Sequence, residues 1–465
     1  MPRSRLHHVI LALLLGLAAA TAGRSAVAAA APEIPLEARA ERPVAPVTAG
    51  ACSPAAPGTC GQVRVEAGGM LADDAGRWTM RGVQFFLPRF GINGKTLWDH
   101  NYAAALADGT LAYWLDKAHG YLRANMLRVY VDLPHRAQDG TIVIPTSAAM
   151  LYDFALNANA RGMRLGLVLH NSADWAMTPE RADWIGGMLD YFIARGGLPM
   201  IAYVNADNEI NNYCANAGKD CFDGDQQRDA QAYVDGAIGW VAQLRSVVEA
   251  RAPQLLVTAG ISTEMIDADQ TRAAFNFFRP DSQGRTLAAL VDFLSPHNFS
   301  GGAAGIIADL RYAGYQGAVV LEEFGFPTDP YPRDAAWTEG LPTCWLDPLQ
   351  TLCAPSAPFF IETNLRAIRT NGYAGGSVWM VADMHEKDTQ FACTDPSKTF
   401  DLWTGLFAIG GTYCDGGTIS RAFGQPKSTA FRVCVAYSGS IPLCTVGTPV
   451  KYSVLLPVVV ETRPP

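Results

Sequence analysis

The sequence predicts an α/β protein folded as a (β/α)8 barrel. Eight apolar runs typical of buried strands alternate with segments that repeat their apolar residues at helical spacing. Strict alternation of strand and helix produces a parallel sheet, and eight such units close into a barrel. An open doubly wound sheet is the alternative, but no Gly-x-Gly-x-x-Gly motif follows the first strand. The strands are expected at residues 78–86, 126–131, 165–169, 200–204 and 255–259, at a sixth run that ends at residue 297, and at 318–322 and 376–381.

Several of the intervening helices carry start signals. Thr146 or Ser147 can cap the helix that follows the second strand. Thr178, Pro179 and Glu180 supply the cap, the first-turn proline and the first-turn acid of the next one. The other helices are expected at residues 111–122, 226–251, 271–278, 302–312, 358–369 and 418–433.

The two ends of the chain differ in composition from the barrel segment. Arg3 and Arg5 precede an apolar run at 9–22, and small residues at 26–28 resemble a cleavage site, so residues 1–30 are expected to be a secretory signal peptide. The run is shorter than the ~20 residues that a membrane-spanning helix needs, so a retained anchor is the weaker alternative. Residues 31–61 are expected to be an Ala/Pro-rich linker, 62–434 the barrel domain and 435–465 a C-terminal tail.

Charge and cysteine content limit the partners and the compartment. The net charge is -8 and no basic stripe is present, which disfavours nucleic acid and anionic membranes as partners. Ten cysteines in an exported chain indicate disulfides rather than zinc ligands. The simplest pairing joins sequence neighbours: Cys52 with Cys60, Cys214 with Cys221, Cys344 with Cys353, Cys393 with Cys414, and Cys434 with Cys444. We expect a secreted monomer without a metal ion or cofactor.

Polar and aromatic side chains stand at or just past the carboxyl ends of six predicted strands. In a closed barrel these ends meet on one face, where barrel enzymes keep their chemistry. Any one of these residues could be a structural group, but so many on one rim indicate a site. The residues are Arg128, His170, Asn208, Glu209, His297, Glu323 and Trp379.

The seventh strand ends on an acidic pair, Glu322 and Glu323. The pair could be a solvated turn, or one of its members could attack a substrate. Two glutamates on facing strands are what cleavage of a glycosidic bond requires, one to protonate the leaving oxygen and one to attack the sugar or direct a water. Glu209 is expected as the acid/base and Glu323, near Arg128, as the ionised nucleophile. By strand alternation Glu322 should point away from Glu323.

Carboxylates about 5 to 5.5 Å apart would predict retention of configuration, and a wider separation would predict inversion. The sequence does not determine the distance between Glu209 and Glu323.

Taken in order, these motifs resemble those of clan A glycoside hydrolases, and most closely those of glycoside hydrolase family 5, the family of cellulases and β-mannanases. The resemblance covers roughly residues 62–434. It implies a retaining double displacement, with Glu209 as acid/base and Glu323 as nucleophile. It also implies that Arg128 keeps the nucleophile charged, that Asn208 binds the sugar 2-hydroxyl, and that Trp379 lies under the sugar whose bond is cleaved.

Two positions depart from the family pattern. Ile210 stands where the family usually has proline after the acid/base glutamate, and Phe299 stands where it usually has a tyrosine that bonds the nucleophile. Phenylalanine cannot make that bond, so either another donor serves Glu323 or its charge is controlled differently. These departures leave open a second hypothesis, a catalytically decayed barrel that binds carbohydrate.

Tryptophans in the predicted rim loops are candidates for stacking on sugars, with Trp175 and Trp345 the first choices and buried loop residues the alternative interpretation. The other rim-loop tryptophans are Trp98, Trp337 and Trp403. Disulfide-bonded loops at 214–221, 344–353 and 393–414 would narrow the cleft. A serine hydrolase is disfavoured because no Gly-x-Ser-x-Gly turn occurs, and a zinc hydrolase because His-Glu-x-x-His is missing.

Overall fold

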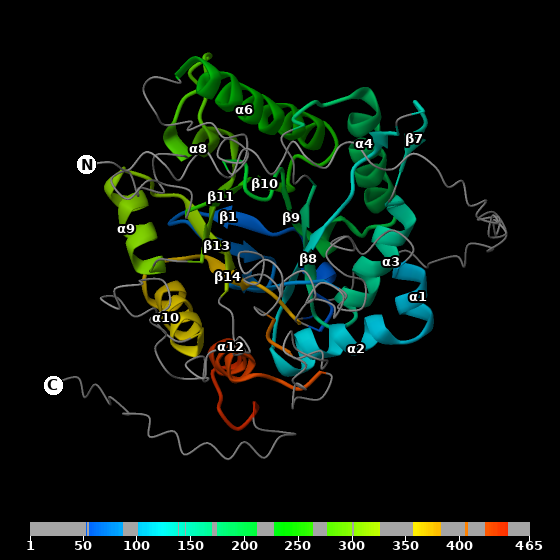
Figure 1. The fold of residues 1–465 in the computed structure, drawn as a ribbon. Helices are drawn as coiled ribbons and strands as arrows, with labels where there is room; N and C mark the ends of the chain where they lie inside the picture. The colour runs from blue at the N-terminus through cyan, green and yellow to red at the C-terminus, as the bar shows by residue number, and fades with distance from the viewer. Residues whose placement is uncertain are drawn as a thin grey trace, which may run out of the picture. The chain divides into compact units, whose positions relative to one another are not determined.

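The protein folds as the closed parallel barrel that the alternation predicts (Figure 1). A computed structural model describes residues 53, 55–86, 101–137, 139–144, 146–169, 174–211, 227–263, 277–299, 302–325, 357–382, 405–407 and 424–444. In the order in which they pair, the barrel strands are β10 (Leu256–Thr258), β9 (Ile201–Asn205), β8 (Arg164–Val168), β5 (Met126–Tyr130), β4 (Met80–Gln84), β14 (Gly375–Val378), β13 (Ala318–Phe324), β12 (Phe293–Asn298) and β11 (Gly260–Ser262).

Strands β10 and β11 are two halves of the fifth barrel strand, separated by Ala259 alone. The first half pairs with β9 and the second with β12, all in parallel, and β14 pairs with β4. The nine segments therefore make eight barrel strands with no free edge. The sequence predicted each of the eight, although the fifth strand continues past the expected end at residue 259.

The helices form the outer layer, and their start signals operate as expected. Ser147 accepts a hydrogen bond from the Met150 amide (3.1 Å), and Thr178 accepts one from the Arg181 amide (3.3 Å). The helices are α1 (Asn101–Ala107), α2 (Thr110–Asp116) with its π-helical continuation η5 (Lys117–Tyr121), α3 (Ala148–Asn159), α4 (Pro179–Ala194), the 3-10 turn η6 (Leu198–Met200), α6 (Gln227–Glu249), α8 (Leu287–Leu290), α9 (Ala303–Tyr312), α10 (Ala357–Thr370) and α12 (Ser428–Ser438). A short hairpin of β6 (His135–Arg136) and β7 (Ile142–Val143) follows β5. Most of the helix expected at 271–278 lies outside the described residues.

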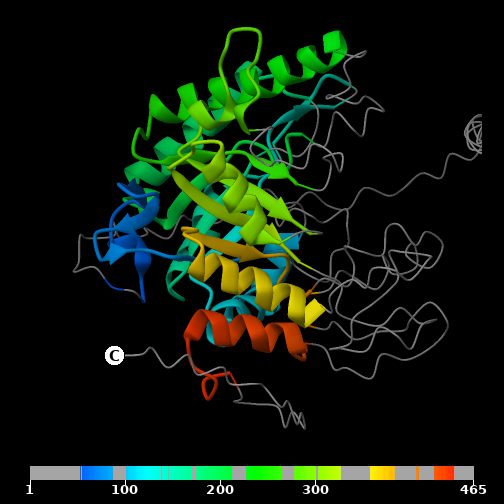
Figure 2. The same ribbon diagram turned by 90° about the vertical axis from the view of Figure 1, so that its left-hand side faces the viewer.

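A small antiparallel sheet lies at the amino-terminal end of the barrel and shares its inner core. It contains β1 (Arg64–Glu66), β2 (Met70–Asp73) and β3 (Gly76–Arg77). Leu71 and Trp78 from this region pack with the inward-facing Met80, Tyr203 and Phe293 of the barrel. Full burial of such side chains contributes about 1.5–3 kcal/mol each. Figure 2 shows the strands running away from this sheet, so their carboxyl ends are at the opposite side.

The folded part begins before the expected end of the linker. Residues 57–59 form a 3-10 turn, η2 (Pro57–Thr59), and the Gly58 amide donates to Asn159 Oδ1 (2.6 Å). The buried Arg164 guanidinium donates to the Pro57 carbonyl (2.5 Å) and pairs with Asp73 (2.9 Å). These contacts attach residues 57–61 to the barrel, because they satisfy a buried cation that the barrel alone leaves without enough acceptors.

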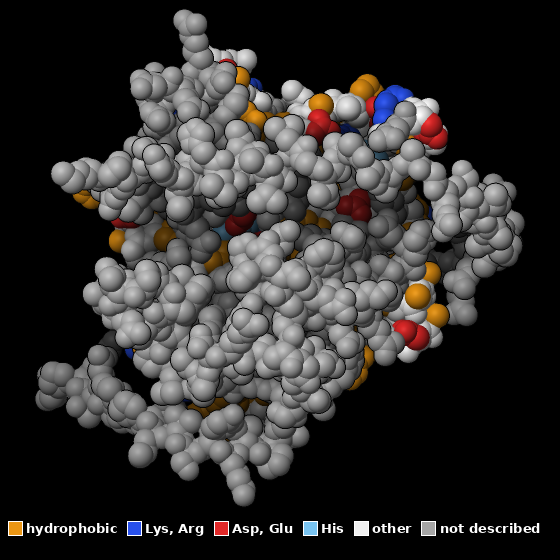
Figure 3. Space-filling model, viewed as in Figure 1, with side chains coloured by type: hydrophobic (Ala, Val, Ile, Leu, Met, Phe, Trp, Pro, Cys, Tyr) orange, Lys and Arg blue, Asp and Glu red, His pale blue; other side chains and the backbone are white. Residues whose placement is uncertain are grey.

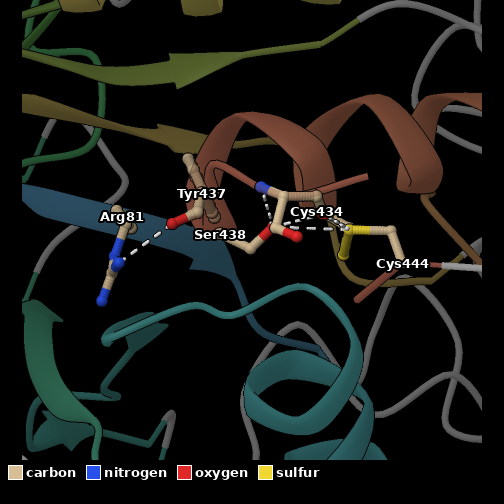
Figure 4. The surroundings of a disulfide bond; sticks show 6 residues. Arg81, Cys434, Tyr437, Ser438 and Cys444 are labelled. Atoms are coloured by element: carbon tan, nitrogen blue, oxygen red, sulfur yellow. Dashed lines mark hydrogen bonds between the residues drawn. A yellow bond between two sulfur atoms is a disulfide. The ribbon is translucent and has the colours of Figure 1, made fainter. Parts of the chain in front are cut away.

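The boundary expected at residue 434 falls inside α12, so the barrel fold extends into the expected tail. Tyr437 donates its hydroxyl hydrogen to the Gly82 carbonyl (2.8 Å). Its own carbonyl accepts a hydrogen bond from Arg81 (2.9 Å), as Figure 4 shows. Cys434 and Cys444 form a disulfide with a Cα–Cα distance of 5.8 Å, the pairing expected for these two residues.

Cys60 is also disulfide-bonded, and the other cysteines lie outside the described residues. Among the described helices, none combines the length and apolarity required to cross a membrane.

Candidate active site

Strand β13 brings both members of the acidic pair to the barrel interior. Between Leu321 and Phe324 it contains one residue more than the facing stretch of β14, and it also has an extra residue relative to β12. Such a bulge interrupts the alternation of side chains. Glu322 and Glu323 therefore both contact Arg128, and both are buried. The expectation that Glu322 points away from the site is wrong, and so is the alternative of a solvated turn.

Arg128, on β5, is the centre of a network that joins four strands. Its guanidinium is fully buried and forms ion pairs with Glu323 through Nη1 and with Glu322 through Nε (3.0 Å). It also donates to Gln84 Oε1 (2.6 Å) and to Asn208 Oδ1 (2.8 Å). The sequence predicted three of these residues for the site and missed Gln84 and Glu322. Gln84 stands directly beside Arg128 in the sheet register, and a polar residue in an apolar strand was the available signal.

Glu209 lies across the rim from Glu323, and His297 lies between them. His297 Nδ1 is 3.1 Å from Glu209 Oε1 and 3.4 Å from Glu323 Oε2, while its Nε2 is 3.6 Å from Glu322 Oε2. Oxygens of Glu209 and Glu323 lie within 4.8 Å of each other. The Glu209 side chain keeps 15% of its surface exposed, against 3% for Glu323. Glu209 is therefore the more accessible of the two carboxyl groups.

The charges in this cluster are strongly coupled. Burial lowers the pKa of His297, but Glu323, Glu209 and Glu322 outweigh it and raise the pKa to about 9. Burial raises the pKa of Glu322, but Arg128 and His297 outweigh it and lower the pKa to about 2.

For Glu323, burial is the largest influence, and it raises the pKa to about 7 against the attraction of Arg128 and His297. The negative charge is therefore more stable on Glu322 than on Glu323. Glu322 also accepts a hydrogen bond from the Asn205 side-chain amide (2.6 Å), whereas Glu209 and Glu322 both repel a charge on Glu323.

Two cations face three carboxyl groups in the cluster. Arg128 and protonated His297 balance two carboxylates, so one carboxyl group must hold a proton if the buried cluster is to be neutral. Glu209 and Glu323 both approach the same histidine nitrogen, Nδ1 of His297. A carboxylate and a carboxylic acid side by side provide a nucleophile and a proton donor at the same pH.

Glu209, His297 and Glu323 also lie close enough to hold a metal ion. The ion pair between Arg128 and Glu323 disfavours this, because that carboxylate already has a cationic partner. Acid–base chemistry fits the donor set better.

Aromatic rings line one side of the site. Trp379, which follows β14, packs edge to face on Phe86 (5.3 Å between centroids) and on Phe299 (6.2 Å). Phe86 stacks on Tyr130 (5.7 Å), and the Arg128 guanidinium lies 5.5 Å from the Tyr130 ring. Tyr130 and Phe86 were missed because each reads as an ordinary apolar residue near a strand end.

Trp175 has a structural partner on each side. Its indole N–H donates to Asp207 Oδ2 (3.0 Å), and its ring packs against Tyr233 of α6 at 5.8 Å. These contacts join the loop after β8 to the end of β9. A stacking role for Trp175 stays a prediction. His170 and Trp345 lie outside the described residues, as do Trp98, Trp337 and Trp403.

Gly260, at the start of β11, permits the close approach of two site elements. A Cβ at this position would lie 1.7 Å from the Asn208 carbonyl oxygen and 2.7 Å from His297 Nε2. The Gly260 amide donates a hydrogen bond to the Asp207 carbonyl (2.9 Å), and the Gly260 carbonyl accepts one from the amide of buried Ile210 (3.0 Å). This contact could not be predicted from the sequence, because it depends on how the neighbouring fourth and fifth barrel strands pack.

From the side toward which the strands run, acidic side chains are visible near the centre of the molecule (Figure 3).

The sequence matches no protein-family model and no curated protein. Among solved structures the chain is similar to an exo-β-1,4-mannosidase from Opitutaceae bacterium strain TAV5, with 16% identity and a TM-score of 0.53 over 82% of this chain and 63% of that one. It is also similar to a β-glucuronidase from Bacteroides uniformis (13% identity, TM-score 0.49, 81% of this chain and 37% of that one) and to a β-1,4-D-mannanase from Cryptopygus antarcticus (16%, 0.48, 69% and 88%). The chain spans less than two thirds of the length of the first two. The likeness to the mannosidase shows the fold, a barrel of the kind found in glycoside hydrolases.

Proposed function

We propose that the protein is a retaining β-glycosidase that hydrolyses O-glycosyl bonds in a β-glycan or its oligosaccharides, of the β-glucan or β-mannan type. The observation that carries the proposal is the pair Glu209 and Glu323, on facing strands, with oxygens within 4.8 Å of each other. That separation leaves no room for the water that an inverting enzyme places between substrate and base, and it is close to the ~5–5.5 Å typical of retention.

In the proposed first step, Glu209 gives its proton to the glycosidic oxygen while Glu323 attacks the anomeric carbon, which forms a glycosyl–enzyme ester and releases the leaving sugar. In the second step, Glu209 takes a proton from water, the water oxygen bonds to the anomeric carbon, and Glu323 departs as a carboxylate. Arg128 and His297 both contact Glu323, so they stabilise the negative charge that returns to it.

The charge count of the cluster fits this chemistry. The mechanism needs one proton shared between the two glutamates, and a neutral cluster with two cations and three carboxyl groups holds one. The proton must sit on Glu209 when substrate is bound. Glu209 contacts one cation, His297, whereas Glu323 contacts two, so the cations support a negative charge on Glu323.

Export, membership in glycoside hydrolase family 5 and a monomeric state are part of the proposal. The basic and apolar amino terminus and the disulfide between Cys434 and Cys444 support export. The order of the rim motifs supports the family, while Ile210 and Phe299 indicate an outlying branch. The similar mannosidase makes β-mannosides the first substrates to test.

The test is a hydrolysis screen of the exported protein on aryl β-glycosides and on manno-, cello- and xylo-oligosaccharides, with the anomer of the first product read by proton NMR. Retention of the β-anomer is expected, together with loss of activity in Glu209→Ala and Glu323→Ala. Azide should restore turnover in both, giving a β-glycosyl azide with the first variant and an α-glycosyl azide with the second.

A Glu66→Ala variant is the matched control, because Glu66 is exposed on β1 at the other end of the barrel. Near-normal turnover in either site variant, or an inverted first product, would refute the mechanism. Oligosaccharide binding without hydrolysis by the unaltered protein would instead support the decayed-barrel alternative.

A further inference from the structure

Glu323 receives its contacts from two cations, and neither comes from the position where the resembled family carries a tyrosine. That position is Phe299, whose ring packs on Trp379 and has no hydrogen to donate. The described contacts to Glu323 are those of Arg128 Nη1 with Oε1 and His297 Nδ1 with Oε2 (3.4 Å). A neutral imidazole carries a hydrogen on only one of its nitrogens, so Nδ1 can donate to Glu323 only in the imidazolium or in the tautomer that leaves Nε2 without a hydrogen.

Glu322 fixes that state from the opposite side of the ring. Its Oε2 lies 3.6 Å from His297 Nε2, and its Oε1 pairs with Arg128 Nε (3.0 Å). The Asn205 amide also donates to Oε2 (2.6 Å), which orients the carboxylate. Glu322 is completely buried, so its charge acts on His297 with little screening by solvent.

We propose that Glu322 is a positioning residue that holds His297 as an imidazolium, so that His297 Nδ1 donates to the Glu209–Glu323 pair. This role rests on the proposed function, since the pair it serves is the proposed catalytic one. The bulge in β13 is what makes the role possible, because it turns Glu322 inward beside Glu323.

Carboxyl groups outnumber cations among the described charged groups around His297. Glu209 approaches from the end of β9, and Glu322 and Glu323 approach from β13. Arg128, from β5, is the opposing cation, but its charge is balanced by the same two β13 carboxylates. The buried phenol of Tyr203, on β9, also lies near Glu322 and carries no charge at neutral pH. Three carboxyl groups around one imidazole, two of them ionised, favour the doubly protonated ring.

The test measures His297 directly. In the full-length protein labelled with nitrogen-15 histidine, the ring nitrogens are followed from pH 5 to 10 by NMR, with the His297 signals assigned by their loss in His297→Asn. The unaltered protein should show the imidazolium pattern at pH 8, consistent with a pKa raised to about 9. Glu322→Gln keeps the shape and removes the charge, and it should lower the midpoint by about one to three pH units.

The matched control is Glu66→Gln, which should leave the midpoint unchanged. A neutral His297 ring at pH 8 in the unaltered protein would overturn the proposal without any variant, so misfolding of Glu322→Gln cannot rescue it. An unshifted midpoint in a folded Glu322→Gln protein would overturn it as well. Where turnover is measurable, the alkaline limit of the pH–rate profile should move to lower pH with the same shift. If the protein hydrolyses no glycoside, the proposed function fails while the NMR titration still decides the role of Glu322.

Discussion

Replacing Gly260 by alanine adds one methyl group at the most crowded point of the site. The new Cβ would lie 1.7 Å from the Asn208 carbonyl oxygen, and real Cβ atoms essentially never approach closer than 3.0 Å, so the two strands must separate by about 1.3 Å. The obstructing atom belongs to the backbone, so a change of side-chain rotamer cannot relieve the contact. The second contact, 2.7 Å to His297 Nε2, pushes the imidazole away from the same side.

The displacement reaches the proposed catalytic groups directly. Asn208 is bonded to Arg128 and precedes Glu209, so a shift of about 1 Å changes the distance between Glu209 and Glu323. A misplacement of that size costs about 10²-fold in turnover. The strained packing should lower the free energy of unfolding by about 1–3 kcal/mol.

The assay compares kcat on the best substrate and the urea midpoint for the unaltered protein, Gly260→Ala and Gly239→Ala. Gly239 lies in α6, and a Cβ there meets no atom within 4 Å. Its substitution should leave kcat unchanged and stabilise the helix by about 0.5–1 kcal/mol. If Gly260→Ala keeps both its turnover and its stability within the range of the Gly239→Ala control, the described approach of β11 to Asn208 is incorrect.

Arg128→Lys keeps the positive charge, but an ammonium group cannot reach the four acceptors of the guanidinium. We expect kcat to fall by about 10²-fold or more and the free energy of unfolding to fall by about 3 kcal/mol. A kcat within threefold of normal would contradict the described network. Burial lowers the pKa of His297, but the surrounding carboxylates outweigh it and raise the pKa to about 9. The charged ring therefore contributes fully to the free energy of unfolding below pH 6.5, and this contribution is lost as the pH rises to about 9. Urea unfolding should show this loss, on the order of 3 kcal/mol, and a His297→Asn variant that lost as much over the same range would refute the assignment. Cys434→Ser should lower the free energy of unfolding by about 3 kcal/mol relative to the oxidised unaltered protein, because it releases the loop closed with Cys444. Under reducing conditions the variant and the unaltered protein should be equally stable, and a difference of the same size there would contradict this explanation.

The strand pattern was readable because it depends on local composition. A strand buried on both faces is a short apolar run wherever it occurs, and the residue after it can be identified from the sequence alone. Arg128, Asn208, Glu209, His297 and Glu323 were placed on one rim in this way, and the structure brings these five together.

Other features were unreadable because they depend on neighbouring strands. The orientation of Glu322 requires counting residues in β12 and β14 against β13, and period-two alternation gives the wrong face when one strand holds an extra residue. Gly260 looks like any loop glycine until Asn208 is beside it. The domain boundaries shifted for the same reason, since Arg164 and Gly82 supply the partners that attach residues 57–61 and Tyr437.

By itself, the sequence determined the barrel and the identity of the two facing glutamates, because hydrophobic periodicity and the ends of buried runs are properties of short segments. The tertiary structure alone decided how the charges are shared. Arg128 and His297 each contact both members of the acidic pair on β13, and only the register of the closed barrel places four ionised groups and one shared proton within contact of each other.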